Sequence, residues 1–248
     1  ITQKIMKITE SVISALVSKK KPLNFLHIGK TGGTSIRSLI THRSNKVFRI
    51  RERLLWRYYP IIHFHKDCRN AFQEKTNLAF FIRNPFDRFY SAFHRGKNPG
   101  NLHGDPMTPG IMELHEQFDT FQSWLEALGL NKASEMKRRA IELQVLDNNL
   151  RMDYKFYFTN KESIERKKKD IVFIGETERF DSDLDNLRTL LGAKSNKFRN
   201  VHLNKAKLVM DRKTEESRQL FQEVFPEEQS LYQELRKIKD IMSNLNRQ

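Results

Sequence analysis

The sequence predicts an α/β fold in which helices cover both faces of a doubly wound parallel sheet. Two observations lead to this prediction. Short apolar segments alternate with helical periodicities along the 248 residues. The composition, with 38% hydrophobic residues, 30% charged residues and 18 Phe, is typical of a chain that folds around a sizeable core. We therefore expect one folded domain spanning residues 1–248.

Four short apolar segments are predicted to be buried strands. They are residues 23–28, 60–65, 78–82 and 171–175. In open α/β sheets the ligand lies beyond the carboxyl ends of the strands. The residues that follow each segment are therefore the first candidates for a site.

Helices are predicted between and after the strands. The expected ranges are 1–20, which is amphipathic, 35–40, a helix that begins after Asn84 and Pro85, 119–128, 134–150, and the C-terminal region 211–248. Asn84 is suited to cap its helix and Pro85 to stand at its first position. Helix 1–20 is expected to pack on the domain, with a membrane-surface helix as the alternative. Residues 95–117, which contain many Gly and Pro, are predicted to be a substrate or lid loop.

The C-terminal region carries apolar residues at alternating spacings of four and three. They are Leu231, Leu235, Ile238, Met242 and Leu245. Two heptads are too few to indicate a coiled coil, so we expect this helix to dock on the body of the domain.

The charge balance indicates an anionic partner. Lys and Arg number 45 against 30 Asp and Glu, a formal net charge of +15. Nucleic acid, acidic lipid, a polyanionic sugar or a phosphorylated nucleotide would each fit. No segment approaches the ~20 apolar residues of a membrane span. A single cysteine, Cys68, permits no internal disulfide and suits a reducing compartment.

A glycine loop follows the first predicted strand. Its sequence, Gly29-Lys30-Thr31-Gly32-Gly33-Thr34-Ser35, precedes a helical pattern. Backbone N–H groups, a helix N-terminus and a lysine together make a phosphate cradle, which gives the fold a P-loop-like character. The motif is not a Walker A sequence, because Lys30 precedes Gly32 and Gly33. A generic turn is the alternative, and Thr34 and Ser35 could instead cap the helix.

A second polar group follows the third predicted strand. Arg83 leaves the strand, while Asn84, Arg88 and Ser91 share one face of the next helix. Arg83 and Ser91 are predicted to converge on a second phosphate. For Arg88 we favour a structural ion pair with a carboxylate. Three aromatic residues of this helix are expected in the core: Phe86, Phe89 and Phe93.

These paired loops resemble those of sulfotransferases that use 3′-phosphoadenosine 5′-phosphosulfate (PAPS). The closer likeness is to the carbohydrate sulfotransferases that include heparan sulfate 2-O-sulfotransferase, and it extends to residues 173–180. Gly29 departs from the pattern, because the family usually has proline there. The resemblance implies that PAPS is the co-substrate, and it assigns the 5′-phosphosulfate to Lys30, Thr31, Gly32, Gly33, Thr34 and Ser35. Arg83 and Ser91 would hold the 3′-phosphate. Asn204 and Lys205 resemble the segment that closes over the nucleotide, although a solvated basic loop fits them equally.

The catalytic base is predicted at the carboxyl end of the second strand. His63 and His65 lie on one face there, and the resemblance implies that one of them, His65 in our prediction, accepts the proton of the attacking hydroxyl while Lys30 serves the leaving group. A structural hydrogen bond is the alternative for His63. Glu113, His115 and Glu116 are reserve candidates. Zinc binding by the histidines and Cys68 lacks an obvious completing ligand, so no metal is predicted.

The sequence as a whole thus predicts a PAPS-dependent sulfotransferase with a carbohydrate acceptor. The alternatives are a P-loop kinase-like enzyme, which would require Mg²⁺ and a Walker A sequence, and a basic nucleic-acid-binding protein, which would leave the glycine loop unexplained. Neither a nucleic-acid partner nor a membrane span is expected. The location is expected to be cytoplasmic if the protein is bacterial. Because the sequence begins at Ile1, the Golgi lumen is the alternative if an upstream anchor was removed.

Overall fold

The structure is a computed structural model that describes residues 23–32, 36, 77–94, 109–190 and 214–245. Several predicted features lie outside these residues. They are the helix at 1–20, the strand at 60–65, all of the helix at 35–40 except Ile36, and the first part of the loop at 95–117.

A parallel sheet forms the centre of the described structure. Its strands β1 (Leu23–Leu26), β2 (Asn77–Ile82) and β3 (Ile171–Glu176) lie in the order β1-β2-β3. Leu26 is in register with Phe80, and Ile82 with Glu176. Three of the four predicted strands are therefore confirmed. The first ends before residues 27 and 28, because the carbonyl of Ile28 already accepts a hydrogen bond from the Thr31 hydroxyl in the following turn.

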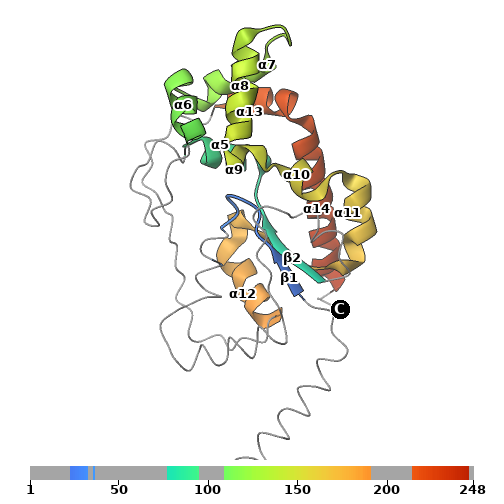
Figure 1. The fold of residues 1–248 in the computed structure, drawn as a ribbon. Coiled ribbons are helices and arrows are strands. Elements are labelled where there is room, and N and C mark those ends of the chain that lie inside the picture. Colours follow the sequence, from blue (N-terminus) through green and yellow to red (C-terminus); the bar gives the residue numbers. More distant parts are fainter. Residues whose placement is uncertain (1–22, 33–35, 37–76, 95–108, 191–213, 246–248) are drawn as a thin grey trace, which may run out of the picture.

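Helices pack on both faces of this sheet, as predicted (Figure 1). Alternate residues of β2 point to opposite sides. Phe80 and Ile82 join a core with α10 (Tyr154–Phe158), α11 (Lys161–Lys167) and α14 (Pro226–Leu245). Ala79 and Phe81 lie on the other face of β2 and pack with Leu184 and Leu187 of α12 (Phe180–Leu190).

A second body of helices lies beyond the carboxyl end of β2. It contains α5 (Pro85–Phe93), α6 (Pro109–Gln117), α7 (Phe121–Gly129), α8 (Glu135–Leu146), α9 (Asn148–Arg151) and α13 (Glu215–Val224). Its core is aromatic. Phe86, Phe89 and Phe93 are all buried there, together with Trp124 and Phe221, which confirms the core assignment of these three phenylalanines.

The predicted helix boundaries are partly wrong for identifiable reasons. Residues 109–117 form helix α6 rather than the end of a loop, since proline is tolerated in a first helical turn. The helix predicted at 134–150 is two helices, because the Asp147 carboxylate accepts hydrogen bonds from the backbone of Asn149 and Leu150 and starts α9. The helix predicted at 119–128 begins instead at Phe121, after the Thr120 cap.

Two other helix predictions are confirmed. The Asn84 side chain caps α5 by accepting from the backbone of Asp87, and Pro85 is the first helical residue. Leu231, Leu235 and Ile238 of α14 are buried against the sheet core, so this helix docks on the body. In the described part of the chain, no helix has the length and apolar character needed to cross a membrane.

Candidate functional site

Three loops follow the carboxyl ends of the strands and contact one another. The glycine loop follows β1, Arg83 and Asn84 follow β2, and the short 3-10 helix η3 (Thr177–Arg179) follows β3. The Thr177 hydroxyl donates to the carbonyl of Ile82 at 3.1 Å, and the Glu178 carboxylate accepts from the backbone of Asn84 at 3.0 Å. Hydrogen bonds therefore join the loops after β2 and β3 at the edge of the sheet where a ligand is expected.

The glycine loop has an unusual backbone. Lys30 has a φ of 65° and Gly32 a φ of 82°, both in the left-handed region. A Cβ on Gly32 would lie 2.6 Å from the ring of Phe180, so the absence of a side chain allows that ring to pack against the loop. A non-glycine residue such as Lys30 adopts this conformation only where its surroundings hold it.

Arg83 connects the glycine loop to the loop after β2. Its Nη1 donates to the carbonyl oxygen of Lys30 at 3.3 Å. Burial lowers the pKa of the guanidinium, while Asp87 and Glu178 oppose this effect. Arginine remains a cation even so. The structure thus brings the guanidinium of Arg83 to the backbone of Lys30, so two predicted site residues lie in contact. Both residue types suit a phosphorylated or sulfated ligand.

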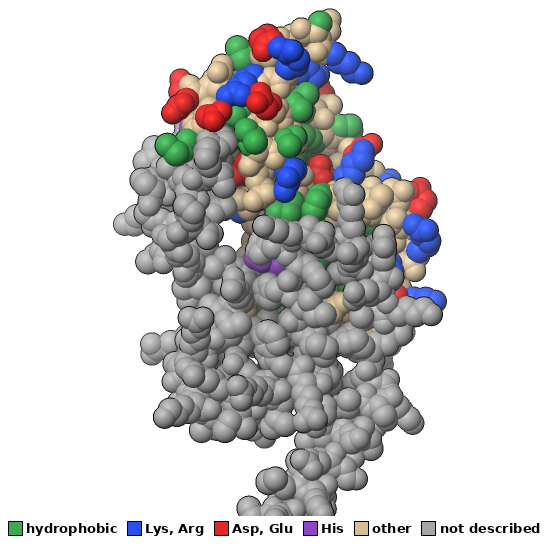
Figure 2. Space-filling model, in the orientation of Figure 1, with side chains coloured by type: hydrophobic (Ala, Val, Ile, Leu, Met, Phe, Trp, Pro, Cys, Tyr) green, Lys and Arg blue, Asp and Glu red, His purple; other side chains and the backbone are tan. Residues whose placement is uncertain are grey.

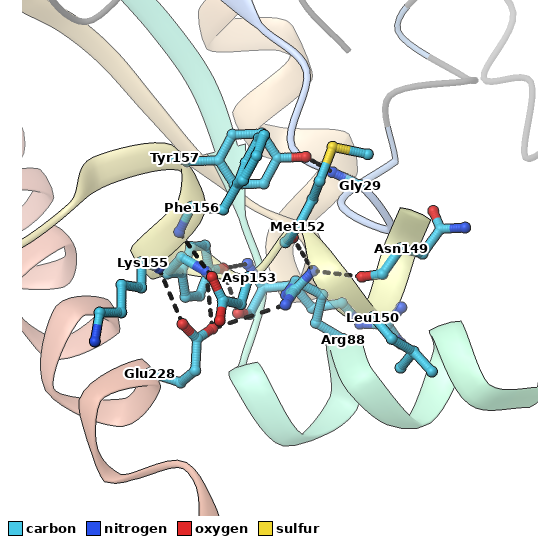
Figure 3. Close-up of polar contacts among 12 residues, drawn as sticks. Gly29, Arg88, Asn149, Leu150, Met152, Asp153, Lys155, Phe156, Tyr157 and Glu228 are labelled. Carbon is cyan, nitrogen blue, oxygen red and sulfur yellow. Dashed lines mark hydrogen bonds and ion pairs between the residues drawn. The ribbon is translucent and has the colours of Figure 1, made fainter. Parts of the chain in front are cut away.

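Two tyrosines of α10 hold the backbone of these loops. The hydroxyl of Tyr157 accepts from the backbone N–H of Gly29 at 3.1 Å. The hydroxyl of Tyr154 accepts from the N–H of Arg83 at 2.8 Å and donates to its carbonyl at 2.6 Å. Figure 3 shows Tyr157 directed at Gly29.

Arg88 takes the structural role that we favoured for it. Its side chain is fully buried and lies 3.7 Å from the Glu228 carboxylate of α14 (Figure 3). It also donates to the carbonyls of Asn149 and Met152. Burial raises the pKa of Glu228 to about 7, although Arg88 opposes this effect. Arg88 therefore joins α5, α9 and α14.

The remaining predicted residues fall into two groups. Thr31 is buried, and its hydroxyl is used within the loop. Ser91 is partly exposed on α5, two turns from Arg83. The others lie outside the described residues, so their roles remain predictions: Gly33, Thr34, Ser35, His63, His65, Asn204 and Lys205.

The reserve bases belong to α6. Glu113 forms an ion pair with Arg139 of α8 at 2.5 Å. The Nε2 of His115 lies 2.8 Å from the carbonyl of Phe93, at the end of α5. Glu116 is exposed. These contacts give Glu113 and His115 structural partners among the helices.

The chain contains two runs of basic residues, 137–139 and 166–169, that could meet an anionic acceptor, and carboxylates lie among them. Arg138 pairs with Glu135, and Lys168 with Glu165. Figure 2 shows blue and red side chains side by side over the described helices on this face. This pattern is typical of a solvated surface. Among the residues that the structure describes, no group of three or more His, Cys, Asp or Glu is arranged to hold a metal ion.

Sequence reasoning did not single out Tyr154, Tyr157 or Glu228. Their partners are far away in the sequence: Tyr154 and Arg83 are separated by 71 positions along the chain, and Tyr157 and Gly29 by 128. The aromatic run at 154–158 gave a signal for burial, but none for a hydrogen bond to a particular loop.

Comparison with known proteins gives one match. The sequence profile of the sulfotransferase family matches residues 14–240, which is most of the chain. Searches of the curated proteins and of the solved structures found no match. The matched range contains the three strands and the three connected loops that follow them. The chain therefore belongs to the sulfotransferase family.

Proposed function

We propose that the protein transfers a sulfuryl group from PAPS to a hydroxyl of a carbohydrate. Membership of the sulfotransferase family supports sulfuryl transfer as the reaction class. The observation that carries the choice of donor is the hydrogen bond from Arg83 to the carbonyl of Lys30, because it joins the two loops assigned to the two ends of one nucleotide.

In this proposal the two loops divide the nucleotide between them. Lys30 and the backbone N–H groups of residues 31–35 bind the 5′-phosphosulfate, and Arg83 with Ser91 binds the 3′-phosphate. The connection between the loops fits this division, since a ligand with anionic groups at both ends needs two cationic sites at a fixed separation. Asn204 and Lys205 would close over the nucleotide.

The chemistry requires little besides placement and charge. Lys30 stabilises the negative charge that develops on the leaving phosphate. His65 accepts the proton of the attacking hydroxyl, with His63 orienting the base or the acceptor. PAPS, when bound, supplies the sulfuryl group. We propose that no metal takes part in the reaction.

A carbohydrate is the proposed acceptor because of the resemblance and the net charge of +15. Basic side chains on the helices are paired with carboxylates, which argues against binding of a polyanionic chain along that surface. We propose no nucleic-acid partner, since the family and the paired loops account for the cationic residues at the sheet edge.

Thermal unfolding with three ligands tests this function. Adenosine 3′,5′-bisphosphate, the product of PAPS, should stabilise the protein in the presence of EDTA. At about 100 times its Kd a ligand adds about 2.7 kcal/mol, which raises Tm by roughly 5 to 11 °C for a chain of this size. Mg-ATP and a single-stranded oligonucleotide should give much smaller shifts.

The contrary results are equally specific. An equal shift with Mg-ATP would favour the kinase-like alternative, and a larger shift with the oligonucleotide would favour nucleic-acid binding. No shift with the bisphosphate would overturn the proposed donor.

A further inference from the structure

Helix α10 contacts both candidate nucleotide loops through two hydroxyls. Tyr157 holds the N–H of Gly29, and Tyr154 holds both backbone polar groups of Arg83. The two tyrosines lie one helical turn apart, so they project from the same side of the helix. Both side chains are buried, with exposed fractions of 0% and 1%.

Helix α10 is itself held in place by α14 and by its own cap. The Glu228 carboxylate accepts hydrogen bonds from the backbone N–H groups of Tyr154 and Lys155, at 2.9 and 3.1 Å. Asp153 caps the helix by accepting from the N–H of Phe156 at 2.7 Å. The ring of Tyr154 stacks on that of Tyr232 of α14. Figure 3 shows the Glu228 carboxylate against the backbone at Lys155. Because these contacts hold both the backbone of α10 and the ring of Tyr154, the position of the helix relative to the two loops is fixed.

The contacts act on the backbone before and after Lys30. Tyr157 holds the N–H of Gly29, in the Ile28–Gly29 peptide group that precedes Lys30 by one residue, and Arg83 holds the carbonyl of Lys30 itself. Between them Lys30 keeps its left-handed φ of 65°. Loss of either contact would allow Lys30 to relax toward the common backbone regions and would move its ammonium group.

We propose that Tyr154 and Tyr157 are positioning residues that set the separation of the two loops and thereby select a nucleotide carrying anionic groups at both its 3′ and 5′ ends. The inference rests on the proposed function, because it assigns one end of the nucleotide to each loop. Neither tyrosine needs to touch the ligand. Their effect is transmitted through the backbone of Gly29 and Arg83.

Gly29 supplies the donor for the hydrogen bond to Tyr157. Proline, which the resemblance leads one to expect at this position, has no N–H and could not donate to Tyr157. Glycine supplies that donor but leaves the backbone less restricted. The Tyr157 hydroxyl thus provides the restraint that a proline ring would otherwise supply.

Calorimetric titration of tyrosine variants tests the proposal. Y154F, Y157F and the double variant would each be titrated with adenosine 3′,5′-bisphosphate and with AMP, which lacks the 3′-phosphate. Y157F removes one hydrogen bond and should weaken bisphosphate binding by roughly 2- to 10-fold. Y154F removes two, to the N–H and to the carbonyl of Arg83, and should weaken it at least as much. AMP binding should change less. The double variant should lose less than the product of the two single losses, because either substitution alone already frees one loop.

Tyr232→Phe is the matched control. Tyr232 is a buried tyrosine of the same core, and no hydrogen bond joins it to either loop among the described contacts. Y232F should keep the wild-type preference for the bisphosphate over AMP. If Y154F and Y157F also keep that preference while their Tm falls, the tyrosines are merely structural and the proposal is overturned.

The unmutated protein provides a second, independent measurement. Hydrogen exchange resolved to the Gly29 amide should show strong protection in the free protein, and rapid exchange there would overturn the proposal even if a variant fails to fold. If the wild-type protein bound AMP and the bisphosphate equally, the assignment of Arg83 to a 3′-phosphate would fail. That result would contradict the proposed function, whereas tyrosine variants that keep the wild-type preference would contradict only the role of Tyr154 and Tyr157.

Discussion

The guanidinium of Arg83 donates a hydrogen bond to the carbonyl oxygen of Lys30, joining a residue that follows β2 to one that follows β1. Adjacent parallel strands bring their carboxyl ends to the same edge, so this contact is a consequence of the sheet order. It also fixes the guanidinium of Arg83 relative to the backbone of the glycine loop. The proposed nucleotide site uses this connection between the two loops.

Arg83→Ala should weaken nucleotide binding much more than it destabilises the fold. A charge-assisted contact to phosphate is worth about 1.5 to 3 kcal/mol, or roughly 10- to 150-fold in affinity. Calorimetric titration with adenosine 3′,5′-bisphosphate measures the loss, and R138A, on an exposed arginine of α8, is the control. An R83A protein that unfolds would show that Arg83 is structural, and one that folds and binds normally would show that Arg83 does not bind the nucleotide.

Glycine substitutions should separate binding from stability. Gly32→Ala forces an L residue to a φ of 82° and into the Phe180 ring, so it should lower both Tm and nucleotide affinity. Gly175 lies in β3, and Gly175→Ala would place a Cβ against the buried ring of Phe81. This variant should lose about 1 to 3 kcal/mol of stability, with little effect on nucleotide affinity in the folded protein. Denaturant unfolding and calorimetry on the same samples distinguish the two. Equal effects of both variants on affinity would contradict the assignment of the glycine loop.

The stability of the protein should depend on pH through Glu228. Burial raises its pKa from 4.5 to about 7, so the folded state binds this proton more tightly than the unfolded state. The stabilisation of the folded state by protonated Glu228 is therefore greatest below about pH 4.5 and is lost as the pH rises through about 7. Its upper limit is about 3 kcal/mol.

The comparison that isolates this effect is between wild type and Glu228→Gln across that pH range. Arg88, Asp153 and Lys155 also influence the carboxylate, and all three are kept in the variant. As the pH rises, the free energy of unfolding of the wild type should fall relative to that of Glu228→Gln. A constant difference would mean that Glu228 ionises normally in the fold.

His65→Ala should separate chemistry from binding. Loss of a general base typically lowers turnover by about 10²- to 10⁴-fold, whereas binding of the bisphosphate should remain nearly normal. Wild-type activity should also fall as the pH drops through the histidine pKa, near ~6.5 for an unperturbed side chain. R138A, at an exposed arginine of α8, is the control. Full activity of H65A with loss in H63A or in E116A would move the base to that residue.

Local patterns predicted the elements that local forces determine. The three strands, the Asn84 cap and the buried phenylalanines of α5 followed from apolar runs and from the capping chemistry of single residues. The loop predicted at 109–117 was wrong, because Gly and Pro indicate a loop only when they do not stand at a helix start. The break at Asp147 depended on one side-chain acceptor inside an otherwise helical pattern.

The candidate site was predictable only in part, for a physical reason. Arg83 stands directly after β2, and Lys30 lies in the loop that follows β1, so the order of the strands brings the two residues to one edge of the sheet. The contacts of Tyr154 and Tyr157 with these loops depend on how α10 docks on the sheet, and that docking is decided by buried partners such as Glu228 and Tyr232. No local spacing in the sequence carries this information.

The most direct test of the proposed function is transfer of labelled sulfate from PAPS to a panel of glycans in the presence of EDTA. The account predicts sulfated glycan and adenosine 3′,5′-bisphosphate in equal amounts, without added metal, and a large loss of this product with R83A. If no glycan or other hydroxyl acceptor is sulfated, while Mg-ATP donates a phosphoryl group to the same panel, the proposed donor and reaction are contradicted.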